Sequence, residues 1–451
     1  METDFDAIVI GAGPGGEVAA TRLLAGGLRV ALVERELIGG ECSYWACIPS
    51  KTLLRAVEAR AEAGAVAGLS TPELDWEALR GYRDDMVRHL DDTAQEAGYR
   101  ERGATVLRGA ARLVGRDPWR VEVAGQRLSA RHVVVATGSR PVRPPVDGLD
   151  GVPVWTNREA TLLRDIPRRA VVIGGGPVGV ELGQFLARMG SRVTIVQRGP
   201  ALLGREEPRL GEIVAGHLRD EGVDVRTGTR VAAARRDGAD TVVELSDGDR
   251  VRADVVVLGA GRRPRTDDLG LEEVGVRPDP RGAVEVDERC RVADGLWAVG
   301  DVTGVALFTH VAKYQARVAA DTILGRPRRA DYTAVPRVVF AQPEIAAVGL
   351  STVRAAERGI ATVATELDVP AAIARPWTYQ TRPTGTLGLV ADRDRRVLVG
   401  AWAVAPQAGE WIHLAALAIR AAIDIEVLRD VVPQFPTYTE AYLTALEQLD
   451  L

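Results

Sequence analysis

Short hydrophobic runs alternate along this chain with amphipathic stretches of helical spacing, which is the pattern of an α/β protein built on parallel sheets. Residues 6–10 predict a buried strand, and residues 17–24 predict a helix that ends near Gly26 and Gly27. Residues 29–33 predict a second strand, so the segment is expected to form one βαβ unit.

The same order of elements returns later in the chain. Residues 170–173, 180–189 and 192–196 predict another strand, helix and strand. Two further buried strands, at residues 133–135 and 255–258, are followed by the similar sequences Ala-Thr-Gly and Gly-Ala-Gly. The repetition predicts two dinucleotide-binding units.

Both units carry the glycine spacing G-x-G-x-x-G between strand and helix. In the first unit Gly11, Gly13 and Gly16 hold these positions, and Glu34 ends the second strand twenty-three residues after Gly11. Such glycines allow a tight turn and the close approach of a pyrophosphate to the helix N-terminus, while the acid binds ribose hydroxyls. We expect a flavin nucleotide in one unit and a nicotinamide nucleotide in the other.

The second unit lacks an acid at the strand end. Its glycines are Gly174, Gly176 and Gly179. The strand ends at Gln197, followed by Arg198 and, nearby, Arg205. A carboxylate here favours the 2′-hydroxyl of NADH, whereas arginine accommodates the 2′-phosphate of NADPH. We therefore predict a preference for NADPH over NADH; the alternative is that both arginines are simply solvated.

Further cofactor contacts are expected where other buried strands end. They are Thr137, Gly138, Gly300 and Asp301 for the flavin nucleotide and Gly261 for the nicotinamide nucleotide. An aspartate that closes a strand suits ribityl hydroxyls. A helix predicted to begin near residue 309, with His310 in its first turn, would stabilise negative charge on a reduced flavin.

Two of the three cysteines, Cys42 and Cys47, lie five residues apart. In a regular helix that spacing separates the Cα atoms by roughly 8.5 Å, beyond the about 4.4–6.8 Å of a disulfide. If the two pair, Cys42 must lie at an irregular helix entrance, which Gly39 and Gly40 permit. The alternative is two buried thiols that never meet. The flanking dinucleotide signals favour a redox-active pair, because disulfides in reducing compartments are usually catalytic. Cys290 is expected in the core.

Composition excludes several classes of partner. The net charge of −5 argues against nucleic acid and anionic membranes, and no metal site is expected. No apolar run approaches ~18 residues and no signal peptide is recognisable, so we expect a cytoplasmic enzyme with a small-molecule substrate. Only Lys51 and Lys313 are lysines among 57 basic residues. Lys51 follows Cys47 by four residues, and a buried ammonium shifts its pKa more readily than a guanidinium.

In order along the chain, these motifs resemble those of the class I pyridine nucleotide–disulfide oxidoreductases, which include dihydrolipoamide dehydrogenase, glutathione reductase and mercuric reductase. The resemblance covers nearly the whole chain. It implies two Rossmann-like dinucleotide-binding domains, for FAD and NAD(P)H, and a C-terminal α+β dimerisation domain with helices near 411–423 and 438–449. The implied boundaries are 1–148 (FAD, first part), 149–268 (NAD(P)H), 269–333 (FAD and central region) and 334–451 (interface). A homodimer is implied.

Carried over by position, the resemblance gives Cys42 the role of the interchange thiol that meets the substrate. It gives Cys47 the role of the charge-transfer thiol beside the flavin. Lys51 and Glu181 resemble the ion pair beside flavin N5. A cation there would stabilise the negative charge that develops during hydride transfer.

The C-terminal segment departs from the family pattern, in which the partner subunit supplies a His-Pro…Glu motif. This chain has Phe435 in place of the histidine, keeps Glu440, and has its last histidine at position 413. A positioned histidine contributes roughly 10²–10⁴ in rate. Without it, the rate of ordinary dihydrolipoamide or glutathione turnover should be lower by a similar factor. Tyr438 is a candidate proton donor, although a phenol with a pKa near 10 is a poor fit and simple packing is the alternative.

We therefore predict an FAD-dependent, NADPH-preferring oxidoreductase that passes electrons through a Cys42–Cys47 disulfide to a non-standard disulfide, thioether or other small electrophile. The alternatives are a quinone-type flavin reductase, a dihydrolipoamide dehydrogenase-like enzyme and a non-enzymatic flavin-binding subunit. Mercury reduction is disfavoured because this sequence shows no C-terminal cysteine pair. The family's ketopropyl-coenzyme M carboxylating enzyme, which also has phenylalanine at this position, is similar in mechanism.

Overall fold

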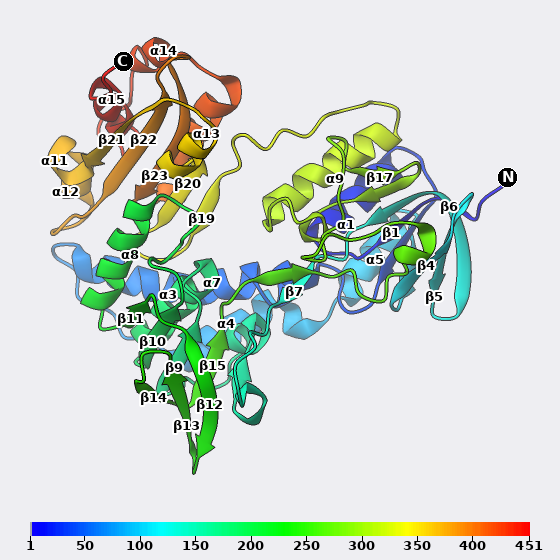
Figure 1. The fold of residues 1–451 in the computed structure, drawn as a ribbon, viewed down its shortest axis with the longest axis horizontal. Coiled ribbons are helices and arrows are strands. Elements are labelled where there is room, and N and C mark those ends of the chain that lie inside the picture. The colour runs from blue at the N-terminus through cyan, green and yellow to red at the C-terminus, as the bar shows by residue number, and fades with distance from the viewer. Residues whose placement is uncertain (1) are drawn as a thin grey trace. The chain divides into compact units, whose positions relative to one another are not determined.

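The protein is described by a computed structural model that covers residues 2–451. The chain divides into two compact units, each built from three segments (Figure 1). Unit 1 comprises residues 2–50, Gly81–Val142 and Gly261–Asp331. Unit 2 comprises Lys51–Arg80, Arg143–Ala260 and Tyr332–Leu451. Parallel sheets, with helices between their strands, confirm the predicted α/β class, while the four predicted domain boundaries stay a prediction.

An eight-stranded sheet forms the centre of unit 1. Its main path runs in the order β17 (Arg291–Ala293), β18 (Leu296–Ala298), β6 (Gln126–Val135), β1 (Phe5–Ile10), β2 (Val30–Glu34) and β3 (Thr105–Arg108), and β5 (Trp119–Val123) and β4 (Ala111–Gly115) extend from β6. Strands β18, β6, β1, β2 and β3 are parallel. The carboxyl ends of parallel strands share one edge of a sheet. The loops that carry Gly11, Thr137 and Asp301 therefore meet there.

Two helices of unit 1 pack side by side on this sheet, α1 (Pro14–Ala25) and α9 (Thr309–Ile323) (Figure 1). Their close approach depends on small residues, because a Cβ on Gly15 would already lie 3.4 Å from the Cβ of Ala312. A two-stranded ribbon, β7 (Ser139–Pro141) with β16 (Arg262–Pro264), belongs to the same unit.

The segment from Cys47 to Glu101 is mainly helical. The structure has α3 (Cys47–Ala65), α4 (Trp76–Met86), a short 3₁₀ turn η1 (Arg88–Leu90) and α5 (Thr93–Glu101). Arg88, His89 and Leu90 have φ angles of 52°, 48° and 61°. Three consecutive left-handed residues cannot continue a right-handed helix, so α4 ends at Met86.

Unit 2 contains the second nucleotide-binding fold. A parallel sheet has the order β11 (Asp224–Thr227), β10 (Arg192–Gln197), β9 (Arg169–Ile173), β15 (Val255–Leu258) and β8 (Val154–Trp155), with helices α6 (Asn157–Thr161), α7 (Pro177–Arg188) and α8 (Pro208–Asp220). A separate antiparallel sheet contains β12 (Val231–Asp237), β13 (Asp240–Leu245) and β14 (Arg250–Ala253).

The C-terminal part of unit 2 is the α+β segment that the sequence predicts. Its antiparallel sheet has the order β19 (Arg337–Val339), β20 (Ile345–Gly349), β23 (Val397–Val404), β22 (Thr386–Asp392) and β21 (Thr362–Asp368). Its helices are α10 (Thr352–Glu357), α11 (Val369–Ala372), α12 (Arg375–Tyr379), α13 (Ala408–Ala421), α14 (Ile425–Arg429) and α15 (Glu440–Glu447). One hydrophobic core joins Val339 and Trp402 of this sheet to Phe185 of α7. Within residues 2–451, no helix combines the length and apolarity that a membrane crossing requires.

Candidate active site

The first glycine motif is shaped by steric contacts around the N-terminus of α1. Gly11 has a φ of +97°, and a Cβ there would lie 2.5 Å from the carbonyl oxygen of Ala136. A Cβ on Gly16 would lie 1.8 Å from the carbonyl oxygen of Gly11. A Cβ on Gly13 would meet nothing within 4 Å. The turn is therefore closed by Gly11 and Gly16, and the space at Gly13 lies open at a helix N-terminus, where a pyrophosphate binds.

The second motif repeats this geometry. Gly174 has a φ of +108°, and its Cβ would lie 2.4 Å from the carbonyl oxygen of Gly259. A Cβ on Gly179 would lie 1.9 Å from the oxygen of Gly174, and a Cβ on Gly176 would meet nothing within 4 Å. Both units thus fit a dinucleotide for the same steric reason.

The side chains that end the second strand of each nucleotide-binding unit, Glu34 and Gln197, make equivalent hydrogen bonds. The Oε2 atom of Glu34 accepts a hydrogen bond of 2.7 Å from the backbone N of Ala12. The Oε1 atom of Gln197 accepts one of 2.9 Å from the backbone N of Gly175. Burial raises the pKa of Glu34, and the backbone donors oppose that shift. Gln197 therefore occupies the position of the acid without its charge.

Arg198 and Arg205 are both exposed beside this second site. Among the described residues, no carboxylate lies within ion-pair distance of either guanidinium. Two cations without a local counterion suit a ligand that brings its own negative charge, such as a 2′-phosphate. The carbonyl oxygen of Gly261 accepts a hydrogen bond of 2.9 Å from the N of Val142, and its role in binding the nicotinamide nucleotide stays a prediction.

Asp301 lies in a polar network at the end of β18. Its Oδ2 atom accepts a hydrogen bond of 2.6 Å from Ser139 Oγ, which in turn accepts one of 2.7 Å from Arg262 Nε. Burial raises the pKa of Asp301, while Ser139 and Arg262 act in the opposite direction. Nearby, Thr137 Oγ1 donates to the carbonyl oxygen of Arg265 at 2.7 Å.

The remaining predicted contacts of the flavin site are placed by the backbone. Gly138 has a φ of +71°, and its carbonyl oxygen accepts a hydrogen bond of 2.9 Å from the N of Arg265. Gly300 has a φ of +83° and donates its N–H to Oε1 of Gln315 at 2.7 Å. The exposed ring of His310 stacks on Phe308 with 5.1 Å between the ring centres.

The two cysteines lie on either side of a break between helices. Cys42 lies in the short helix α2 (Gly40–Tyr44), and Cys47 is the first residue of α3. Gly39 and Gly40, with φ angles of 121° and 61°, begin this segment and confirm the expected irregular entrance. Both cysteines are thiols in this structure.

The side chains of Cys42 and Cys47 lie close together, because both sulfurs contact the same hydroxyl. Thr309 Oγ1 lies 3.3 Å from Cys42 Sγ and 3.4 Å from Cys47 Sγ. The hydrogen bond to Cys47, together with burial, raises the pKa of Cys42. Cys47 instead begins a 19-residue helix, a position that stabilises a thiolate.

Lys51 and Glu181 form the predicted ion pair in unit 2. The Nζ atom of Lys51 lies 2.7 Å from Oε2 of Glu181, and it also lies 4.8 Å from the centre of the Phe340 ring. Helix α3 carries both Cys47 and Lys51, one helical turn apart.

The C-terminal candidates have three different environments. Phe435 is 74% exposed. Tyr438 is buried, with its ring stacked on Trp411 at 6.2 Å and edge-on to Tyr379 at 6.0 Å. Burial raises the pKa of Tyr438 to about 12. Among the described residues, the Tyr438 hydroxyl and Oε2 of Glu440 have no hydrogen-bond partner. The packing explanation therefore fits Tyr438 better than proton donation does.

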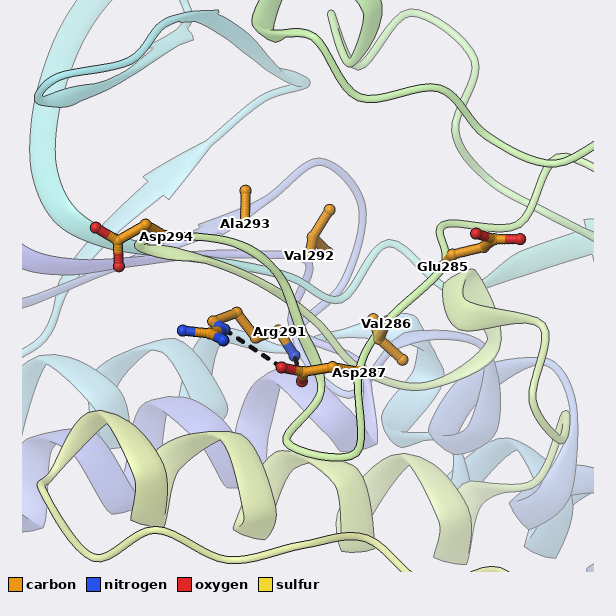
Figure 2. Close-up of a pocket in the computed structure, with 7 residues that line it drawn as sticks. All are labelled: Glu285, Val286, Asp287, Arg291, Val292, Ala293 and Asp294. Atoms are coloured by element: carbon orange, nitrogen blue, oxygen red, sulfur yellow. Dashed lines mark hydrogen bonds and ion pairs between the residues drawn. The ribbon is translucent and has the colours of Figure 1, made fainter.

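An open cavity elsewhere in unit 1 is lined by residues of β17 and of the segment before it (Figure 2). Its polar lining is mainly acidic, with Glu285, Asp287 and Asp294, and Arg291 already pairs with Asp287 at 3.3 Å. No predicted site residue lines it. Its charge does not suit a nucleotide phosphate.

Sequence reasoning missed several residues that the fold places in the site. Ala136 and Gly259 make the closest approach to the glycine turns, whereas the predicted cofactor contacts Thr137, Gly138 and Gly261 stay predictions. Thr309 contacts both sulfurs although 262 residues separate it from Cys47. The only local signal for Thr309 was its position at the start of a predicted helix.

Comparison with known proteins identifies the family. The family described as pyridine nucleotide-disulphide oxidoreductase matches residues 5–316, and its dimerisation domain matches residues 335–446, which supports the expected homodimer. The chain is 37% identical to mercuric reductase from Streptomyces lividans, with 99% of this chain and 96% of the relative covered. It is 36% identical to dihydrolipoyl dehydrogenase from Thermus scotoductus, with 99% and 97% covered.

A similar solved structure is the HOCl-induced flavoprotein disulfide reductase RclA from Escherichia coli, with a TM-score of 0.87, 28% identity and coverage of 98% of this chain and 99% of that one. A Cu(II) complex of RclA matches with a TM-score of 0.86, again at 28% identity and covering 98% and 99% of the two chains. The chain therefore belongs to the pyridine nucleotide-disulphide oxidoreductase family, as a flavin-dependent enzyme that binds FAD and uses NAD(P)H.

Proposed function

We propose that this enzyme uses NADPH to reduce a small electrophilic substrate through a redox-active Cys42–Cys47 pair. The observation that carries the proposal is the position of the two sulfurs, both within 3.4 Å of Thr309 Oγ1. Two sulfurs that share one hydroxyl as a neighbour are candidates for forming and breaking one S–S bond. A cytoplasmic location stays a prediction.

The chain's own residues are suited to hold the two nucleotides. Gly11, Gly13 and Gly16 with Glu34 would bind FAD, and Asp301 would bind its ribityl chain. Gly174, Gly176 and Gly179 with Arg198 and Arg205 would bind NADPH. FAD, when bound, supplies the two-electron carrier between NADPH and the cysteines. Lys51, held by Glu181, is the cation that we propose for stabilising negative charge during reduction.

The cysteines have unequal roles in this proposal. Two electrons and one proton break the S–S bond and leave one thiol and one thiolate. The raised pKa of Cys42 and the helix-start position of Cys47 favour the proton on Cys42 and the charge on Cys47. Cys47 is then the charge-transfer thiolate, and Cys42 is the thiol that meets the substrate.

A protonated Cys42 is a weak nucleophile, and the histidine that would activate it is replaced by Phe435. The ring of Tyr438 is packed against Trp411 and Tyr379. Burial raises its pKa further above neutral pH, which makes the phenol a weaker proton donor. These features support an acceptor that differs from dihydrolipoamide and glutathione disulfide. A non-standard disulfide, a thioether or another small electrophile is the proposed class.

Anaerobic titration with NADPH tests the proposal. A long-wavelength charge-transfer band between thiolate and flavin is expected after two-electron reduction of the wild type. Cys42→Ser should keep a band, because Cys47 then remains a thiolate, and Cys47→Ser should lose it. Cys290→Ser, which alters a buried cysteine outside the pair, is the matched control and should behave as the wild type. A band that survives Cys47→Ser would refute the assignment.

Turnover separates the remaining candidates. Under the proposal, Cys42→Ser abolishes turnover of the physiological acceptor in a screen of disulfides, thioethers, quinones and thiophilic metal ions. If the wild type reduces only quinones, and Cys42→Ser does so equally well, the enzyme is a quinone-type flavin reductase instead. The lack of an activating histidine is the observation that favours this second candidate.

A further inference from the structure

The hydroxyl of Thr309 contacts both cysteine sulfurs. Its Oγ1 atom lies 3.3 Å from Cys42 Sγ and 3.4 Å from Cys47 Sγ. A threonine hydroxyl has a single proton to donate and two lone pairs that accept. It can therefore donate to one sulfur while it accepts an S–H from the other, and it can exchange these two roles by rotation of the hydroxyl.

The hydroxyl has no competing structural task. Thr309 is the first residue of α9, and the residue that precedes it, Phe308, makes no side-chain cap. Within residues 2–451, the two sulfurs are the only hydrogen-bond partners of the Thr309 side chain. Because Phe308 holds the N-cap position, the hydroxyl of Thr309 is free of the capping role and is available to the sulfurs.

Negative charge on either cysteine sulfur would also lie near the N-terminal end of a helix. Helix α9 has 15 residues, and its positive end is at Thr309. Cys47 itself begins the 19-residue helix α3. The Thr309 contact acts on the pKa of Cys42 in the downward direction, against the hydrogen bond to Cys47 and burial. Thr309 thus counteracts the features that hold the proton on Cys42.

We propose that Thr309 is a catalytic residue whose hydroxyl donates to whichever cysteine sulfur carries the negative charge. The inference rests on the proposed function. Two electrons and one proton convert the disulfide into Cys42 thiol and Cys47 thiolate, and Thr309 then donates to Cys47 while the Cys42 S–H donates within the pair. When Cys42 loses its proton to attack the substrate, the Thr309 hydroxyl turns to Cys42.

The test compares Thr309→Val, which keeps the shape and removes the hydroxyl, with Thr309→Ser, which keeps the hydroxyl. Thr322→Val is the matched control, because Thr322 lies in the same helix and donates to Val318 O at 2.8 Å. The charge-transfer absorbance of the two-electron-reduced proteins is titrated with pH. A hydrogen bond to a charged group should shift the midpoint by about one pH unit, a tenfold change in acidity.

The expected result is an upward midpoint shift in Thr309→Val, with Thr309→Ser and Thr322→Val within about 0.3 pH units of the wild type. A Thr309→Val midpoint equal to that of the wild type would overturn the inference.

A second readout does not depend on the flavin. The reduced proteins are alkylated with iodoacetamide across the pH range, and mass spectrometry distinguishes Cys42 from Cys47. Loss of the hydroxyl should move the alkylation profile of Cys42 to higher pH by a similar amount, whereas an unchanged profile would count against the inference. If wild-type protein shows no charge-transfer band at any pH, the proposed function itself fails. If the band is present but insensitive to Thr309, only the role of Thr309 fails.

Discussion

Glu181 holds Lys51 with one oxygen while its other oxygen is bonded to the backbone. Oε2 lies 2.7 Å from Lys51 Nζ, and Oε1 accepts a hydrogen bond of 2.9 Å from the N of Phe340. The Glu181 side chain is only 8% exposed. Because the carboxylate is fixed at both oxygens, it positions the ammonium of Lys51, and the Phe340 ring 4.8 Å away adds a cation–π contact.

Replacing Lys51 by methionine should therefore slow reduction of the enzyme by NADPH. Removal of one pre-placed charge from a reaction site typically costs about 100-fold in rate. Anaerobic stopped-flow absorbance of the bound flavin measures the effect. Arg55→Met, one turn further along α3 and exposed, is the control and should change the rate less than about threefold. A Lys51→Met rate equal to that of the control would remove Lys51 from the mechanism.

Nucleotide preference should follow the side chains around Gln197. The double change Gln197→Glu with Arg198→Ala adds a carboxylate where Glu34 stands in the other unit and removes a cation. The ratio of kcat/KM for NADPH over NADH should fall by about tenfold or more, since a carboxylate selects the free 2′-hydroxyl. Steady-state rates with both nucleotides give the ratio. A wild type that already prefers NADH tenfold would show that Arg198 and Arg205 are only solvated.

Histidine at position 435 should create disulfide turnover. Phe435 is exposed, and five residues later Glu440 has a buried carboxylate oxygen without a hydrogen-bond partner among the described residues. Phe435→His would supply a base that this oxygen could orient. We expect lipoamide or glutathione disulfide turnover to rise by about 100-fold. Phe435→Leu should give no increase, and adding Glu440→Gln to Phe435→His should lower the gain.

Tyr438→Phe should stabilise the protein, because it removes a buried hydroxyl without a partner. We expect a gain of about 1 kcal/mol in the free energy of unfolding near neutral pH. The pKa of Tyr438 is raised from 10.0 to about 12, so the folded state holds the phenol proton more tightly than the unfolded state. As pH rises above 10.0, the unfolded chain releases that proton first, and the wild type loses stability until about pH 12.

Thermal unfolding at pH 8 and at several values above pH 10 checks this sign. The advantage of Tyr438→Phe should grow with pH across the window. Trp411→Phe would instead remove packing area against the same ring, and it serves as a destabilising comparison. A lower melting temperature for Tyr438→Phe at pH 8 would mean that the hydroxyl has a partner in the assembled homodimer.

Elements with strong local signals could be predicted from sequence. The glycine motifs, with a strand before them and a helix after them, located both nucleotide units and the bounds of α1 and α7 within a few residues. The irregular entrance before Cys42 followed from adjacent glycines, whose steric freedom is a local property. By contrast, the turn at Arg88–Leu90 has no glycine or proline, so nothing in its sequence marks the left-handed backbone.

The chemistry of the cysteine pair depended on contacts that sequence does not display. Thr309 reaches the sulfurs because β18 is adjacent to β6 in the sheet and α9 follows it, an arrangement set by long-range strand pairing. The raised pKa of Cys42 arises from its hydrogen bond to Cys47 and from burial, both of which are set by the fold. The resemblance to a family supplied roles for both residues, but the physical reason for the asymmetry came from the fold.

The steric identity of the two glycine turns has a consequence for damage to the enzyme. A methyl group at Gly16 would collide with the backbone of Gly11, and one at Gly179 would collide with the backbone of Gly174. Each substitution should therefore prevent nucleotide binding at one of the two sites. The visible outcomes would be opposite. A chain altered at Gly16 would be purified colourless, whereas one altered at Gly179 would stay yellow even in excess NADPH, so colour alone would reveal which half had been lost.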